Sequence, residues 1–222
     1  MTWTLPNTLT VIRLATAPGL ALVFLLLPRP LADWAALILF VGAAATDWLD
    51  GRLARAWGQE SAFGAMLDPI ADKAMVALAL LVVAALSGLS VWTLLPASLI
   101  LFREVFVSGL REYLGAAAGL LKVTRLAKWK TTLQMTAISL LFAQGIFAHY
   151  FGMGVFGMDG ATVDGILSGA IPDEGGLNAL YLGLQLTSYG GLALLWVAAA
   201  LTVVTGWDYF RKALPLLTEA RT

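Results

Sequence analysis

Cysteine is absent from these 222 residues, and His149 is the only histidine. The lack of thiols excludes disulfides, thiolate nucleophiles and cysteine-ligated zinc, and a single histidine excludes a histidine-rich metal site. Charged residues make up only 13% of the chain, about half of the usual fraction in a soluble domain. Hydrophobic residues make up 59%, and the net charge is zero. This composition predicts an integral membrane protein and gives no indication of a nucleic-acid partner.

Long polar stretches are scarce as well, and apolar runs of about 20 residues, the length that crosses a bilayer as a helix, divide the chain. We therefore predict an all-α fold, a bundle of six transmembrane helices in one domain that covers 1–222. The predicted spans are 8–27, 33–56, 62–86, 92–116, 127–151 and 180–207. No Lys or Arg precedes the first run and no clean cleavage site follows it, so we expect a retained membrane helix rather than a secretory signal.

Lysine and arginine are distributed unevenly between the two sides of this predicted bundle. With six spans, both ends of the chain share a side with the basic connections that follow the second and fourth spans. The opposite side holds Arg29 and the segment 152–179, which has four acidic residues and no basic one and is expected to form an exposed loop or a short surface helix. Because cytoplasmic loops carry the excess of Lys and Arg, the basic side is predicted to be cytoplasmic and the acidic segment extracytoplasmic.

Against this apolar background, the stretch DWLDGRLARAWGQESAFGAMLDPIAD at 47–72 holds four carboxylates, those of Asp47, Asp50, Asp68 and Asp72. Each pair shares a helix face, and an antiparallel helix pair would bring both pairs together at one membrane interface. Because an aspartate at the bilayer centre costs about 2.5–3.5 kcal/mol, the cluster must be neutralised. Carboxylate oxygens suit hard ions such as Mg²⁺ or Mn²⁺, and four of them suit a pair of ions. The alternative is that the aspartates cap helices or pair with Arg52 and Arg55.

Small residues accompany these carboxylates. Gly51, Ala54 and Gly64 leave space for the close approach of backbone or ligand. The whole stretch reads D-x2-D-G-x2-A-R-x8-G-x3-D-x3-D, which resembles the signature of the CDP-alcohol phosphatidyltransferase family. The resemblance implies a transferase of the bacterial cytoplasmic (inner) membrane, with a polar, metal-lined cavity that faces the cytoplasm.

The resemblance also implies roles for individual residues. Two divalent ions, Mg²⁺ or Mn²⁺, would hold the diphosphate of CDP-diacylglycerol, and Asp72 would also be the catalytic base on the acceptor hydroxyl. The implied metal ligands are Asp47, Asp50, Asp68 and Asp72. The implied neighbours of the nucleotide are Asp47, Gly51, Ala54 and Arg55.

Polar residues elsewhere bear on the acceptor. In PNTLTVIR, the side chains of Asn7, Thr10 and Arg13 recur every three residues and form one polar strip on an apolar helix. The segments FREVFVSGLREYLG and KVTRLAKWKTTLQM add a dense set of cations, which favours an anionic acceptor, most simply a phosphate. Two alternatives stay open: the second basic segment can be a positive-inside anchor, and Glu104 and Glu112 can be salt-bridge partners.

These three segments resemble the branch of the family whose acceptor is sn-glycerol 3-phosphate. The residues that this implies for the acceptor phosphate are Arg103, Arg111, Lys128 and Lys130. The residues expected to support the site are Asn7, Thr10, Arg13, Gly64, Thr131 and Gln134. The nearest alternatives are phosphatidylglycerol or an inositol phosphate as acceptor. A divalent-cation transporter that uses the same aspartates is a distant alternative, disfavoured because the acids cluster near one face of the membrane.

Two weaker patterns give smaller predictions. Gly115 and Gly119 form a GxxxG motif, which favours helix packing within the bundle, with a homodimer seam as the alternative. Asp208 is expected to be solvated or paired with Arg211.

Overall fold

A computed structural model describes residues 4–57, 61–120 and 125–219. Within these ranges, the side chains of residues 6, 47–57, 116, 118, 120, 125–128, 218 and 219 are not described. The longer helices are α1 (Leu5–Leu26), α2 (Leu31–Trp57), α3 (Ala62–Leu86), α4 (Val91–Leu114), α5 (Arg125–Gly154) and α8 (Gly191–Glu219). The shorter ones are α6 (Gly160–Leu167), α7 (Leu177–Gln185), a 3₁₀ helix (Gly115–Leu120) that follows α4, and a π-helical turn (Leu186–Gly190) that joins α7 to α8.

Helix boundaries follow local sequence signals. The side chains of Thr4 and Ser61 accept hydrogen bonds from the backbone N–H groups of Asn7 and Gly64, and so cap the first turns of α1 and α3. Gly115 ends α4 because its φ of 51° is a conformation that residues with a Cβ rarely adopt.

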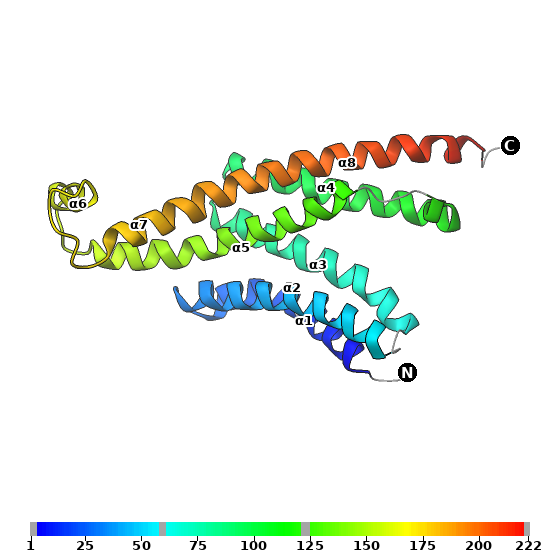
Figure 1. The fold of residues 1–222 in the computed structure, drawn as a ribbon, viewed down its shortest axis with the longest axis horizontal. Coiled ribbons are helices and arrows are strands. Elements are labelled where there is room, and N and C mark those ends of the chain that lie inside the picture. Colours follow the sequence, from blue (N-terminus) through cyan, green and yellow to red (C-terminus); the bar gives the residue numbers. More distant parts are fainter. Residues whose placement is uncertain (1–3, 58–60, 121–124, 220–222) are drawn as a thin grey trace.

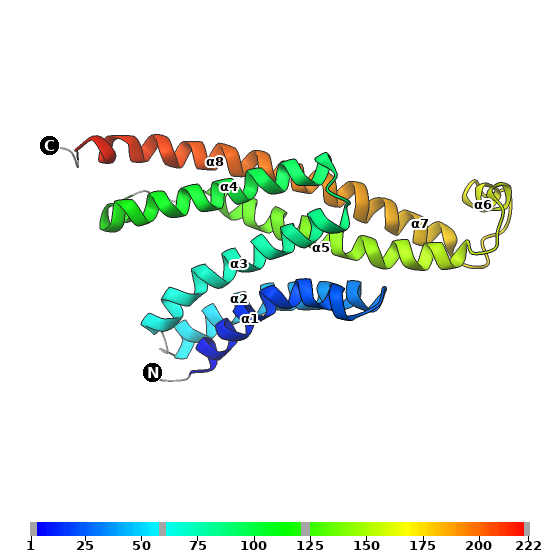
Figure 2. The ribbon, with the colours of Figure 1, turned by 180° about the vertical axis from the view of Figure 1, so that it is seen from behind.

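Both chain termini lie at one end of the molecule, where α2 also finishes and α3 begins (Figure 1). Figure 2 shows the same arrangement from behind, with α5 and α7 continuing past the other helices to the opposite end, where α6 lies. Helix α1 packs against α2 and α3, α8 packs against α4 and α5, and α2 contacts α5. The largest fully buried apolar side chains are Leu20, Phe40, Met75, Leu80, Pro96, Ile100, Ile138, Phe142 and Leu195.

The all-helical prediction is confirmed for the described part of the chain, and the six predicted spans correspond to α1, α2, α3, α4, α5 and the continuous α7–α8 rod. Among the residues that the structure describes, five helical segments are long and apolar enough to cross a membrane, and α2 adds the shorter apolar segment Leu31–Thr46. The acidic segment contains the short helix α6, which is one of its two expected forms.

The prediction that the GxxxG motif packs within the bundle is wrong. Gly115 and Gly119 lie in the 3₁₀ helix beyond the end of α4, and within the described part of the chain no neighbouring atom comes within 4 Å of the Cβ position of either residue. Neither glycine therefore packs inside the bundle. The alternative seam between two copies stays a prediction.

An ion pair between Arg29 of the α1–α2 connection and Asp33 of α2 lies against α5. Asp33 has no solvent-exposed surface, and its carboxylate accepts hydrogen bonds from Nε of Arg29, at 2.7 Å, and from Nη2 of the same residue. The hydrogen bond with Asp33 raises the pKa of Arg29 above its ordinary value. A Cβ on Gly145 of α5 would overlap both partners, so this glycine is what lets α5 approach the pair.

We expect Gly145→Ala to lower the free energy of unfolding by about 1–3 kcal/mol, because the added methyl group must displace an ion pair whose carboxylate is buried. The thermal midpoint of the detergent-purified protein measures this effect. Gly152→Ala is the matched control, since Gly152 is also in α5 and no atom lies within 4 Å of its Cβ position. Equal midpoints for the two variants would contradict this account of Gly145.

Candidate active site

A polar seam joins α1 to α3. Asn7, Thr10 and Arg13 lie on one face of α1, as their spacing predicts, and their exposed fractions are only 4%, 2% and 2%. Thr10 Oγ1 donates a hydrogen bond to Asp68 Oδ1 at 2.8 Å. Arg13 Nη1 forms an ion pair with Asp72 Oδ1 at 3.4 Å. Helix α1 therefore supplies a partner for each aspartate of α3.

The seam also gives a structural reason for Gly64. Ser61 Oγ donates to Asn7 Oδ1 at 2.8 Å, and a Cβ on Gly64 would lie only 2.8 Å from that same oxygen. The missing side chain at position 64 thus makes room for Asn7 of α1. The predicted close approach of a ligand to Gly64 stays a prediction.

The two aspartates of α3 sit one helical turn apart and face the same way. Two carboxylates one turn apart offer the oxygen ligands that a hard divalent ion prefers, so the described pair fits part of such a site. The Asp72 side chain keeps 53% of its surface exposed while Arg13 beneath it is buried. A carboxylate that is anchored from one side and open on the other can bind a ligand.

The other half of the predicted carboxylate cluster lies at the end of α2. The structure does not describe the side chains of this segment, nor the surroundings of Gly51. The predicted residues concerned are Asp47, Asp50, Ala54 and Arg55. Among the described residues, no three metal-binding side chains form a group. The convergence of all four aspartates therefore stays a prediction.

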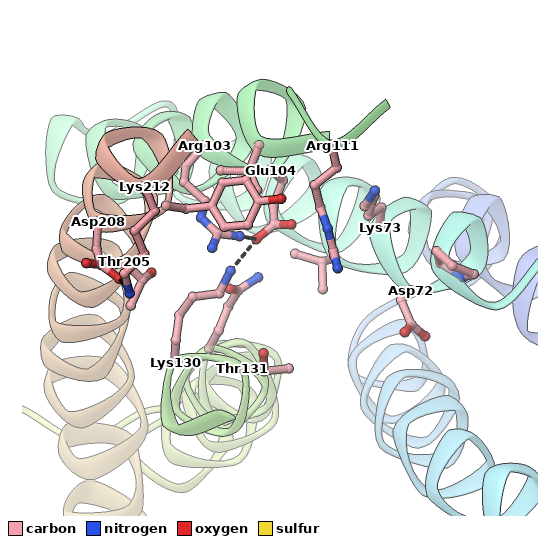
Figure 3. Close-up of a pocket in the computed structure, with 15 residues that line it drawn as sticks. Asp72, Lys73, Arg103, Glu104, Arg111, Lys130, Thr131, Thr205, Asp208 and Lys212 are labelled. Atoms are coloured by element: carbon pink, nitrogen blue, oxygen red, sulfur yellow. Dashed lines mark hydrogen bonds and ion pairs between the residues drawn. The ribbon is translucent and has the colours of Figure 1, made fainter. Parts of the chain in front are cut away.

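A cavity of about 310 Å³ opens beside Asp72, between α3, α4, α5 and α8 (Figure 3). Most of the side chains that line it are charged or polar. They are Asp72 and Lys73 from α3, Arg103, Glu104 and Arg111 from α4, Lys130, Thr131 and Gln134 from α5, and Thr205, Asp208, Tyr209 and Lys212 from α8.

Glu104 is the centre of a largely buried charge cluster in this cavity. Its Oε1 accepts hydrogen bonds from Arg103 Nη1, at 3.2 Å, and from Lys130 Nζ. Lys130 is only 5% exposed, so this contact is largely removed from solvent. The prediction of Glu104 as a salt-bridge partner is confirmed, and the pair ties α4 to α5.

Helix α8 forms a wall that the sequence patterns did not predict. A Cβ on Gly206 would lie 2.8 Å from Cγ of Arg103, so the glycine lets the arginine stem cross between α4 and α8. Asp208 pairs with Lys212 at 2.6 Å, and the predicted Arg211 partner is wrong. Residues three and four positions on both lie next to Asp208 on the helix surface, so the sequence alone does not separate the two partners.

The structure thus brings together several residues that the sequence predicted separately. The predicted site residues that line the cavity are Asp72, Arg103, Arg111, Lys130, Thr131 and Gln134. Those in the seam are Asn7, Thr10, Arg13 and Gly64. Lys128 lies outside the described side chains. The prediction missed Lys73, Thr205, Tyr209 and Lys212; the i, i+4 spacing of Asp208 and Lys212 at the end of an apolar run was the one available signal.

Comparison with known proteins defines the class. The model of the CDP-alcohol phosphatidyltransferase family matches residues 3–162, and the chain belongs to this family. The family and the enzyme class predicted from the sequence are therefore confirmed.

Individual relatives share one name, CDP-diacylglycerol–glycerol-3-phosphate 3-phosphatidyltransferase. A protein of this name from Cereibacter sphaeroides is 55% identical over 221 residues, which cover 100% of both chains. One from Rickettsia bellii is 38% identical over 207 residues, 93% of each chain. One from Escherichia coli K12 is 40% identical over 159 residues, 70% of this chain and 86% of its own. The reaction predicted from the sequence is the one that these names state.

The seam yields a test of how α1 supports the carboxylates. We expect Thr10→Val to slow the release of CMP from CDP-diacylglycerol by about tenfold or more, because a hydrogen bond to a charged group is lost without a change in shape. Thr16→Val is the matched control: Thr16 is also in α1, and its hydroxyl donates to the backbone carbonyl of Ile12, with no other partner among the described residues. A similar rate for both variants would show that the Thr10 contact does not support the reaction.

Proposed function

We propose that this chain transfers a phosphatidyl group from CDP-diacylglycerol to sn-glycerol 3-phosphate, with phosphatidylglycerophosphate and CMP as products. The observation that carries the proposal is the cavity, in which the open carboxylate of Asp72 lies across from a set of cations. A carboxylate can accept a proton from an attacking hydroxyl, and the cations can hold the phosphate of the same small acceptor. The shared name of the relatives supports this choice of substrates.

In this proposal, the four aspartates bind the donor substrate, CDP-diacylglycerol, through metal ions. Asp47, Asp50, Asp68 and Asp72 hold a pair of divalent ions, Mg²⁺ or Mn²⁺. When bound, the ions neutralise the diphosphate and stabilise the leaving CMP. Support comes from the described pair on α3: Asp68 accepts a hydrogen bond from Thr10, and Asp72 forms an ion pair with Arg13.

The nucleotide and the reacting hydroxyl are proposed to contact different residues. The residues proposed to border the cytidine nucleotide are Asp47, Gly51, Ala54 and Arg55. Asp72 accepts the proton of the attacking hydroxyl, and Arg13 keeps that carboxylate oriented from the α1 side. No covalent intermediate on the protein is required, because the acceptor oxygen attacks the phosphorus directly.

The acceptor phosphate is proposed to lie on Arg103, Arg111, Lys128 and Lys130, with Thr131 and Gln134 in support. Arg103 and Lys130 meet on Glu104, so their charges are held in place before any ligand arrives. Fixed charges lose less entropy on binding than mobile ones. A neutral or cationic acceptor such as serine or choline would gain nothing from them.

The chain is proposed to be one domain, 1–222, in the bacterial cytoplasmic (inner) membrane. Its cavity lies towards the end that holds both termini, since Arg111 is close to the end of α4, Lys130 close to the start of α5 and Lys212 close to the end of α8. The excess of Lys and Arg at this end supports the proposal that it faces the cytoplasm and that α6 lies outside.

CMP release by the detergent-purified protein tests the reaction. With CDP-diacylglycerol and Mg²⁺, we expect release only when sn-glycerol 3-phosphate is added, and none with inositol phosphate or phosphatidylglycerol. Removal of the metal with EDTA should stop it. Release with one of the other acceptors would reassign the substrate, and metal flux in proteoliposomes without CMP release would favour the transporter alternative.

Asp72→Asn should lower kcat by about 10²–10⁴-fold, because the amide keeps the shape of the side chain but cannot accept the proton. Asp164→Asn, in α6 at the other end of the molecule, is the control for the loss of one negative charge. Turnover of Asp72→Asn close to the unchanged protein, with CMP as product, would exclude Asp72 as the base.

A further inference from the structure

The charges that line the cavity are not balanced. Five cationic side chains and three carboxylates surround it. Glu104 accepts hydrogen bonds from both Arg103 and Lys130, and Asp208 pairs with Lys212. The third carboxylate, that of Asp72, pairs with Arg13 from outside the cavity lining.

Two of the five cations that line the cavity take no part in these pairs. Among the described residues, neither Lys73 nor Arg111 has an ion pair or a hydrogen-bonded side-chain partner, and both are exposed. In Figure 3, both lie between Asp72 on one side and the Glu104–Lys130 pair on the other. Lys73 also interacts electrostatically with Glu104. Lys73 is therefore inside the charge arrangement of the cavity and has no carboxylate of its own.

We propose that Lys73 is a further binding residue for the phosphate of the acceptor and that it acts together with Arg111. The inference rests on the proposed function and extends it to a residue that the sequence patterns did not indicate. A phosphate monoester carries between one and two negative charges at neutral pH, which matches the two cations that lack a partner. Arg111 offers a planar fork of donors, and Lys73 offers a point charge on a flexible stem.

The position of Lys73 also suits the geometry of a short acceptor. It follows Asp72 directly in α3, so its ammonium group and the proposed base start from neighbouring points of the backbone. Glycerol 3-phosphate has a phosphate at one end and a hydroxyl at the other. An acceptor of this length that is held by Lys73 and Arg111 can present its hydroxyl to Asp72. The phosphate then serves as the anchor that selects this alcohol over neutral ones.

The test compares Lys73→Gln and Lys73→Arg with the unchanged protein. At saturating CDP-diacylglycerol and Mg²⁺, we expect Lys73→Gln to raise the KM for glycerol 3-phosphate by about tenfold or more, because a charge-assisted contact is lost. Lys73→Arg, which keeps the charge, should stay within about threefold. The KM for CDP-diacylglycerol and the pH dependence of kcat should not change in either variant.

Arg211→Gln is the matched control, because Arg211 is an exposed cation near the end of α8 that does not line the cavity. Its KM for glycerol 3-phosphate should stay at the value of the unchanged protein. An equal rise in this variant would mean that the general positive charge of this membrane face attracts the substrate, and would overturn the specific role of Lys73.

Other outcomes would overturn the inference in different ways. A higher KM for CDP-diacylglycerol would move Lys73 to the donor site. A shifted pH profile of kcat at unchanged KM would mean that Lys73 acts on Asp72 instead.

A binding measurement keeps the test valid if Lys73→Gln loses turnover. Glycerol 3-phosphate is expected to raise the thermal midpoint of the unchanged protein, and to raise that of Lys73→Gln by less. If the unchanged protein releases no CMP with this acceptor, the proposed function itself fails, which is a separate result from an unaltered KM in the variant.

Discussion

A charged side chain within a membrane needs a partner, and much of this structure can be understood from that requirement. Asp68 and Asp72 stand on a helix whose one other charged residue is Lys73, and α1 carries a hydroxyl that contacts Asp68 and a guanidinium that contacts Asp72. The partners are buried, whereas Asp72 is half exposed. The support is thus rigid and sits behind the carboxylate, and the open side of the carboxylate faces the cavity. The same requirement explains the Arg29–Asp33 pair at the opposite end and the Glu104 cluster between α4 and α5.

The cavity combines this rigid support with a second group of helices. Helices α1 and α3 hold the carboxylate side, and α4, α5 and α8 hold the cationic side. Close approach between these helices depends on a few positions without a side chain, such as Gly206 beside Arg103. Opposite charges therefore meet across a space that is wide enough for a small anion, and the carboxylates of Asp72 and Glu104 each have a partner on their own side.

The sequence predicted the parts of the site that depend on local periodicity. The spacing of Asn7, Thr10 and Arg13 placed them on one face, and the spacing of the aspartates placed Asp68 and Asp72 together, because a helix repeats every 3.6 residues. The cations of the fourth and fifth spans came from their density in an apolar chain. The family resemblance added the substrate and the metal pair, and the family is confirmed.

Local periodicity cannot predict which helices pack against each other. The wall of α8, the pairing of α1 with α3 and the packing reason for Gly64 all depend on contacts between distant segments. The partner of Asp208 was misjudged although both candidates are local, because residues three and four positions on both lie next to it on the helix.

The polar seam between α1 and α3 has a consequence for the order in which the chain enters the membrane. Helices are made from the N-terminus onwards, so Thr10 and Arg13 are already in the bilayer when Asp68 and Asp72 arrive. The most costly charges of α3 thus meet partners that are in place before them. The wall that α8 contributes comes last, more than 130 residues after Asp72, since it begins at Thr205. The carboxylates are therefore stabilised early in biosynthesis, while the cavity that they serve is closed only by the final helix.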